Sequence, residues 1–324
     1  MAFSMAAVPN TSILLFDREP PIVAWFLTFD VIAAVSYVSY IAVMAIILKH
    51  RKKRFNNTFF ALVVSMGICD IGCLTIHFTF LTPGAILGQH ALPVWHRAFW
   101  GFMWEWLNNS STTHIPFIAL NRLLAVYCPN TYENYFGRSR LIAIVVFCYS
   151  WDLGITIFCY SCTSVLNVPG LTYTLSFLED SCGIWTIRTL QLEDVIGTSL
   201  SLCLNIAIFV KVRKVGKEVV SQASSAQSKK ENKLLFQFAA IYAFYTVFSA
   251  VFWIVEFFGR TSDVAVMQMV LTTVFTLHSS INPFMLIAFG TEMKQVIFGR
   301  CMKKKQPKIS FRSRSTVKTV EIRQ

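Results

Sequence analysis

The sequence has few charged residues for its length. Charged residues make up 14% of its 324 residues, against roughly 25% in soluble domains. Hydrophobic residues make up 55%. This balance excludes an ordinary soluble domain, so we expect a protein that lies in a membrane.

Several features of enzymes and transporters are also missing. The soluble segments hold no nucleophile–base motif, no phosphate-binding loop and no cysteine–histidine cluster with metal-ligand spacing, so we expect neither an enzyme nor a cofactor. No internal repeat divides the chain into related halves, which counts against transporters built from inverted repeats. The segment after Met1 lacks the basic start of a cleavable signal peptide, so we expect the first span to begin insertion.

The chain instead contains seven long apolar stretches, each of about the 20 residues or more that a membrane-spanning helix needs. The stretches are 22–48, 58–81, 97–127, 141–165, 192–212, 234–258 and 264–289. We therefore predict an all-α membrane protein, in which residues 22–290 form a bundle of seven transmembrane helices.

The basic residues gather on one side of these stretches. All but four of the 29 Lys and Arg residues lie there; the exceptions are Arg18, Arg97, Arg188 and Arg260. Positive charge marks the cytoplasmic side, so we predict a plasma-membrane protein with an extracellular N-terminus and a cytoplasmic C-terminus. The net charge of +12 flanks apolar spans, which indicates contact with anionic lipids rather than nucleic acid.

The segments outside the bundle carry candidate modification sites. The extracellular segment 1–21 holds a sequon for N-glycosylation at Asn10. Residues 291–302 can form a short amphipathic eighth helix on the membrane surface, followed by a cytoplasmic basic tail at 303–324. Cys301, beside this tail, is either a palmitoylation site or an unmodified cysteine.

The cysteines fall into two groups by position. Cys182 lies in the second external loop, and its nearby candidate partner is Cys162, at the outer end of the fourth stretch. A bridge between them would close a loop of about 20 residues, and both a bridged and an unpaired Cys182 remain open. Six further cysteines lie within spans or at their inner ends, where we expect small apolar core residues: Cys69, Cys73, Cys128, Cys148, Cys159 and Cys203.

Charged side chains inside a bilayer cost about 2.5–3.5 kcal/mol each on insertion scales, so they should face the bundle interior. Glu105 lies in the outer part of the third stretch beside Trp104, and Asn108, Asn109 and Thr112 extend one polar face. Two interpretations fit this face. It either pairs with a cationic ligand or an arginine, or it forms a hydrogen-bond network between helices.

The expected spans also contain Asp30, Asp152 and Glu256. Glu256 lies in the outer half of the sixth stretch, one turn from Trp253, and either shares the ligand cavity or reaches the outer headgroups. We expect Asp30 and Asp152 to link neighbouring helices rather than to contact a ligand.

The second and seventh stretches each place polar groups at mid-span. Asp70 lies in the second, and Ser279 and Asn282 lie in the seventh. A buried carboxylate with hydroxyl and amide partners could bind a sodium ion or a proton. Pro283 removes a backbone hydrogen bond and therefore predicts a hinge at this point of the seventh helix.

Arg122 follows Glu105 by 17 residues, roughly 25 Å along a helix. It should therefore lie at the cytoplasmic end of the same span. By position alone, an arginine there marks the interface by extending its charged group toward water.

These residues together resemble a rhodopsin-like G-protein-coupled receptor. The matching motifs are Asp70, Asn121-Arg122-Leu123, Trp151 and Asn282-Pro283. A second set is similar to the nematode serpentine chemoreceptors of class X: Thr113-His114, Ile118 to Arg122, Cys128-Pro129, Tyr132, Phe136, and the stretch around Cys182-Gly183. The resemblance covers residues 22–300.

The resemblance implies a chemosensory receptor that binds an extracellular small molecule or peptide and activates a heterotrimeric G protein through Asn121 and Arg122. Asn121 stands where the family has an acid that pairs with the arginine, and Arg97 stands where many members have a cysteine. The inactive-state lock and the usual loop bridge must therefore differ. A seven-helix transporter or channel and a non-signalling membrane partner are the alternative functions.

Overall fold

The computed structural model of the chain describes six continuous stretches and a few positions beyond them. The stretches are 20–50, 57–87, 93–161, 163–167, 174–177 and 181–219. The further positions are 247, 250, 273, 276–284, 286, 287, 293 and 296. The expected sixth span, 234–258, therefore lies almost wholly outside the described residues.

Most of the described residues are helical. The helices are α1 (Pro20–His50), α2 (Thr58–Ile76), the π-helix η2 (His77–Leu81), α3 (Thr82–Leu87), α4 (Val94–Tyr127), α5 (Tyr132–Phe136), α6 (Arg138–Ser161) and α7 (Ser181–Val219). The first three expected spans agree with α1, with α2 and η2 together, and with α4.

Local chemistry explains two of the helix boundaries. Asn57 caps α2, because its side chain accepts a hydrogen bond of 2.9 Å from the Phe60 amide, one of the amides that a first helical turn leaves unpaired. Gly137 separates α5 from α6. A Cβ at this position would lie 2.8 Å from the Glu133 carbonyl oxygen, so the turn requires a glycine.

The structure corrects the expected ends of the fourth and fifth spans. α6 ends at Ser161, and β1 (Thr163–Asn167) pairs antiparallel with β2 (Thr174–Phe177), so the expected end of the fourth span at 165 was too late. α7 begins at Ser181 rather than at 192, which shortens the external loop. Apolar composition alone could not reveal either boundary, because strand pairing depends on a second segment.

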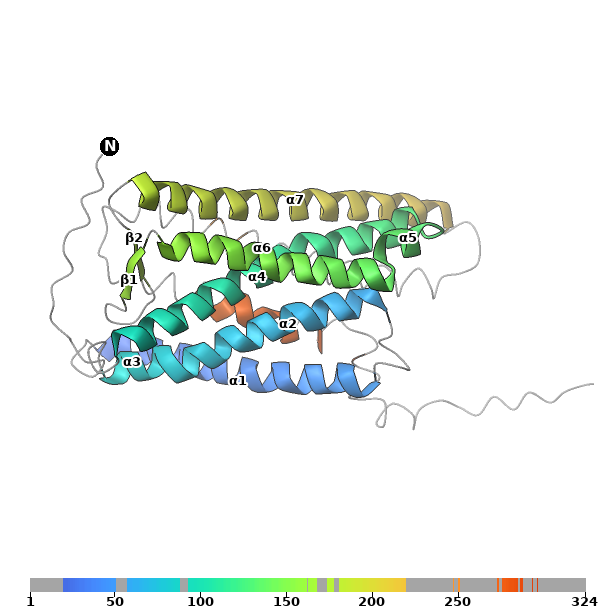
Figure 1. The fold of residues 1–324 in the computed structure, drawn as a ribbon. Helices are drawn as coiled ribbons and strands as arrows, with labels where there is room; N and C mark the ends of the chain where they lie inside the picture. Colours follow the sequence, from blue (N-terminus) through green and yellow to red (C-terminus); the bar gives the residue numbers. More distant parts are fainter. Residues whose placement is uncertain are drawn as a thin grey trace, which may run out of the picture.

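The helices pack side by side in an elongated bundle (Figure 1). α4 crosses the bundle obliquely and contacts α2, α6 and α7. α5 lies at the end of the bundle where α4 finishes and α6 begins, and the β1–β2 hairpin lies at the opposite end. β1 contacts α4, and β2 contacts α7. α4 therefore runs from one end of the described bundle to the other.

Four helical segments of the described residues are long and apolar enough to cross a membrane. They are Val23–His50, Thr58–Gly84, Arg138–Ser161 and Arg188–Lys211. Large apolar side chains on these helices point outward; on α1, Val31 and Val38 are 63% and 66% exposed. Outward apolar side chains on such helices fit contact with lipid tails.

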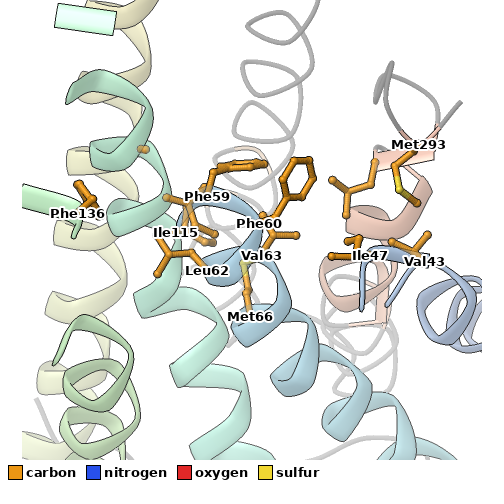
Figure 2. Close-up of a cluster of buried hydrophobic side chains, with 13 residues drawn as sticks. Val43, Ile47, Phe59, Phe60, Leu62, Val63, Met66, Ile115, Phe136 and Met293 are labelled. Atoms are coloured by element: carbon orange, nitrogen blue, oxygen red, sulfur yellow. The ribbon is translucent and has the colours of Figure 1, made fainter. Parts of the chain in front are cut away.

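The largest core cluster of the described residues lies at the end of the bundle that contains α5. Figure 2 shows Phe59 and Phe60 of α2 beside Ile115 of α4, with Phe136 and Met293 in the same cluster. Met293 is 1% exposed and helical, and Val296 packs against the cluster. These two residues belong to the expected eighth helix, 291–302, whose other residues lie outside the described part.

The cysteine expectation holds for four of six residues. The buried free cysteines are Cys69, Cys73, Cys148 and Cys159. Cys128 and Cys203 are exposed instead. Cys128 follows the last residue of α4, and Cys203 lies on the outer face of α7, so neither contributes to the core.

Candidate functional site

The middle of α4 carries seven successive polar residues, 108–114, and most of them pair with other helices or with their own. Ser111 points to α2, Thr113 to α6, and His114 to α2 again. Thr112 instead bonds to the Asn108 carbonyl of its own helix at 3.1 Å. This polar belt makes α4 less apolar than the four segments named above and gives it polar contacts with two neighbours.

Asp70 of α2 is fully buried at the centre of the bundle. Ser111 donates a hydrogen bond of 2.6 Å to its Oδ1, and Asn282 Nδ2 donates one of 2.9 Å to its Oδ2. The Tyr40 hydroxyl also donates to Oδ2. One carboxylate therefore receives side chains from α1, α4 and the helical segment 276–284.

The sequence predicts that Asp70 lies close to polar residues of the seventh span, and the structure brings some of these residues together. Asn282 reaches Asp70, and Ser279 and Pro283 are buried in the same helical segment. Tyr40 and Ser111 were missed as partners. Ser111 follows Asn109 and Ser110 in the polar belt, but the pattern does not say which helix each side chain faces. Tyr40 had no distinguishing signal within its apolar helix.

Glu105 is buried in α4 on the hairpin side of the polar belt, with 5% of its surface exposed. Asn109 Nδ2 donates a hydrogen bond of 3.2 Å to its Oε1, so the expected polar face from Glu105 to Asn109 exists. Trp104 is 8% exposed and packs against Cys73 and Phe80. Asn108 is half-buried on the same stretch of helix.

No ion pair joins Glu105 to Arg97 or Arg188 among the residues that the structure describes. Two further carboxylates, Glu193 and Asp194 of α7, lie within electrostatic range of Glu105. Acidic side chains of α4 and α7 therefore lie near one another at this end. Neither residue of α7 was selected from the sequence, because both stand at the expected start of the fifth span and their nearness to Glu105 depends on how α4 and α7 pack.

Asp152 and Glu193 connect α6 to its neighbours. Thr113 Oγ1 donates a hydrogen bond of 2.9 Å to Asp152 Oδ1, and the Trp151 indole donates one of 2.9 Å to Glu193 Oε1. Asp152 is fully buried. These contacts join α6 to α4 and α7, as expected for an acid that links helices.

Asp30 likewise links α1 to η2 and α3. His77 Nε2 lies 2.8 Å from Asp30 Oδ1, and Thr82 donates to the same oxygen at 3.0 Å. His77 opens the π-helical turn η2, where the backbone widens. The expectation that Asp30 links helices therefore agrees with the structure.

His114 forms a buried junction of three helices. Its Nε2 lies 2.9 Å from Ser65 Oγ of α2, and its ring packs against Tyr149 of α6 with centroids 5.4 Å apart. The Tyr149 hydroxyl donates a hydrogen bond of 2.9 Å to the Ser65 carbonyl. α2, α4 and α6 are therefore fixed to one another midway between Glu105 and Arg122.

Asn121 and Arg122 lie near the α5 end of α4. Asn121 is 1% exposed, and its Nδ2 donates to Thr58 Oγ1 at 3.1 Å and to the Tyr132 hydroxyl at 2.8 Å. Thr58 and Tyr132 also hydrogen-bond to each other. This triad ties the start of α2 and the start of α5 to α4.

Arg122 contacts an aromatic ring. Its Cζ lies 3.4 Å from the centroid of the Phe59 ring. A few residues further along α4, the Tyr127 hydroxyl donates a hydrogen bond of 2.9 Å to the Ala207 carbonyl of α7. Lys211 Nζ lies 5.4 Å from the Tyr127 ring centroid. The sequence pattern indicated Asn121 and Arg122 as site residues. It did not indicate Phe59, Thr58 or Lys211, because these residues become neighbours of the site only in the folded bundle.

Several predicted site residues cannot be placed. Trp253, Glu256, Cys162, Asn10 and Cys301 lie outside the described residues. Cys182 lies within the first turn of α7, but its side chain is outside the described part as well. Within that part, no group of three or more His, Cys, Asp or Glu residues suits a metal ion.

Comparisons with known proteins support one overall fold. The family model described as "Serpentine type 7TM GPCR chemoreceptor Srx" matches residues 31–290. The crystal structure of squid rhodopsin is similar with a TM-score of 0.71, over 88% of this chain and 82% of that one, at 12% sequence identity. No curated protein matches the chain by sequence. The expected seven-helix membrane fold is confirmed.

Proposed function

Because the chain belongs to the Srx family of serpentine G-protein-coupled chemoreceptors, we propose that it binds an extracellular ligand near Glu105 and activates a heterotrimeric G protein near Arg122. The class X resemblance and the chemosensory receptor function are confirmed by the family match, and the family is one of receptors rather than enzymes. One observation supports a ligand site and a coupling site that act together. α4 contains both Glu105 and Arg122, and it contacts α2, α6 and α7.

The proposed orientation places the α5 end of the bundle in the cytoplasm of a multi-pass plasma-membrane protein. Basic residues support it, because Lys49 and His50 end α1 and Arg138 begins α6 at that end. Positive charge beside apolar spans favours the cytoplasmic side. Epitope tags at the two termini test it. The C-terminal tag should stain only in permeabilised cells. Staining of the C-terminal tag in intact cells would show that the protein has the opposite orientation.

The acidic group at the opposite end supports a cationic small molecule or peptide as ligand. Glu105, Glu193 and Asp194 lie within electrostatic range of one another there, and a bound cation would favour their ionised forms. Trp104, Asn108 and Asn109 lie on the same stretch of α4 and supply an aromatic ring and amide groups. Trp253 and Glu256 of the sixth span remain proposed members of this site.

A sodium ion near Asp70 remains a proposal. The Asp70 carboxylate and the hydroxyl oxygens of Ser111 and Ser279 are ligand types that hard cations accept. Ser111 Oγ lies 2.6 Å from the carboxylate, so two such oxygen atoms are already adjacent. A bound sodium ion would supply positive charge to the centre of the bundle.

The proposed coupling is tested by nucleotide exchange. The full-length chain, reconstituted in lipid nanodiscs with purified heterotrimeric G proteins, should accelerate nucleotide exchange. Arg122→Ala should abolish this acceleration while surface expression in cells stays near that of the parent. Full exchange by an expressed Arg122→Ala variant would remove Arg122 from the coupling site.

Two alternative functions give different results in the same system. A transporter or channel would move substrate or ions across vesicles that contain no G protein. A non-signalling partner would show neither flux nor exchange. The buried polar groups in the described residues favour the receptor. Asp30, Asp70 and Asp152 form hydrogen bonds to neighbouring helices, whereas a transporter or channel needs polar groups that line a continuous path for its substrate.

A further inference from the structure

Two consecutive residues of α2 contact two consecutive residues of α4 at the proposed coupling end. Thr58 Oγ1 accepts the 3.1 Å hydrogen bond from Asn121. Phe59 lies under the Arg122 guanidinium, with 3.4 Å between Cζ and the ring centroid. The first turn of α2 therefore holds both residues that the family resemblance assigns to coupling.

The Phe59 ring is a fixed partner. It is 2% exposed, and it packs edge-on against the Phe60 ring with centroids 5.1 Å apart. It belongs to the core cluster at this end of the bundle (Figure 2). The Asn57 cap anchors the backbone of the same turn. The position of the ring is thus determined by core packing.

A guanidinium over a buried ring is stabilised by the negative charge of the ring face, and more strongly where water is excluded. Its planar shape stacks on a ring while its N–H groups stay directed toward the edge. The preceding residue cannot supply a counter-charge, because Asn121 is neutral and donates to Thr58 and Tyr132. The ring face of Phe59 is therefore one partner of the Arg122 guanidinium at this end of α4.

We propose that the stacking of Arg122 on Phe59 is a latch that holds the resting state, and that G-protein engagement requires the guanidinium to leave the ring. This inference rests on the proposed function, because it assigns the regulation of the same coupling site. Phe59 is a positioning residue, since it acts on the G protein only through Arg122. The contact lowers the population of the active state in the absence of ligand.

The test is basal nucleotide exchange without ligand, by the full-length chain in nanodiscs with a panel of purified heterotrimeric G proteins. Phe59→Leu keeps an apolar side chain but removes the ring, so basal exchange per folded receptor should rise about tenfold, as expected for loss of a shielded cation–π contact. Phe59→Trp, whose ring binds cations more strongly, should give basal exchange at or below that of the parent.

Phe136→Leu is the matched control. Phe136 is also 2% exposed in the same core cluster, but its ring stacks on Tyr132 with centroids 5.9 Å apart. Its replacement costs a comparable amount of core packing, so basal exchange should stay at the parent level. Basal exchange in Phe59→Leu at or below the parent level overturns the latch. If Phe59→Leu does not fold, elevated exchange in Phe59→Trp overturns it instead.

A second readout separates the latch from the proposed coupling. Cys128 is an exposed cysteine at the end of α4, so a fluorophore attached there, with the other reactive cysteines replaced, reports movement of that end without a G protein. Changed emission in Phe59→Leu with no exchange by any variant supports the latch and removes the coupling proposal. Exchange by the parent, with emission and basal exchange unchanged in Phe59→Leu, removes the latch alone.

Discussion

Asn282 Nδ2 donates a hydrogen bond of 2.9 Å to Asp70 Oδ2, although the two residues are 212 positions apart in the sequence. The bond joins the seventh expected span to α2. Tyr40 and Ser111 bring α1 and α4 to the same carboxylate. A single buried acid therefore holds together helical segments from both ends of the chain.

Asp70→Ala should lower the thermal stability of the protein. The change removes the acceptor that Tyr40, Ser111 and Asn282 share, and a buried hydrogen bond that is lost costs about 1–3 kcal/mol. Thermal unfolding of the detergent-solubilised chain measures the effect. Asp70→Asn, which retains one carbonyl oxygen, should lose less. An unchanged Tm in Asp70→Ala would contradict the role of this carboxylate.

Sodium should stabilise the parent chain if the ion binds near Asp70. At matched ionic strength, Tm should be higher in sodium chloride than in N-methylglucamine chloride, because a ligand that binds only the folded state raises stability. Asp70→Asn should lose the difference, since the carboxylate charge is removed. Equal Tm values for the parent in the two salts would exclude a sodium site.

Thr113→Val should destabilise the protein by about 1–3 kcal/mol, because it removes a hydrogen bond to the buried Asp152 carboxylate. The neighbouring Thr112→Val is a matched control. Thr112 bonds only within α4, to the Asn108 carbonyl, so its replacement should cost less. Denaturation of both variants in the same detergent provides the comparison, and equal losses would mean that the link from α4 to α6 contributes little.

Glu105→Gln should weaken the response to a cationic agonist. Removing the carboxylate charge from a buried ion pair should raise the half-maximal concentration of a protonated amine by at least about tenfold. A neutral agonist of similar shape provides the control, since its response should change little. Nucleotide exchange measured against agonist concentration gives both curves. Identical curves for the amine would place its ammonium group away from Glu105.

Much of the helical framework was predictable, because long apolar stretches can satisfy their backbone in lipid only as helices. The first three spans agree with the structure to within a few residues. The boundary near Ser161 was not predictable, since β1 forms only by pairing with β2. Glu193 was not selected from the sequence, because its partner Trp151 comes from another helix.

The candidate sites were also predictable only in part, because contacts between helices cannot be read from the sequence of one helix. Asp70 and Asn282 could be paired because both are polar residues at mid-span, and Glu105 and Arg122 could be placed at opposite ends by counting helical turns. Phe59 could not be selected. An apolar residue in an apolar span carries no mark of its partner, and its contact with Arg122 depends on how α2 and α4 cross.

The polar belt of α4 has a consequence for how the protein is made. Seven successive polar residues at the centre of a helix oppose its transfer from the translocon into lipid on its own. Ser111 and Thr113 find their partners on α2 and α6, and α6 is synthesised after α4. The nascent α4 should therefore wait beside the translocon until both neighbours are present, so that membrane integration and tertiary assembly become one event.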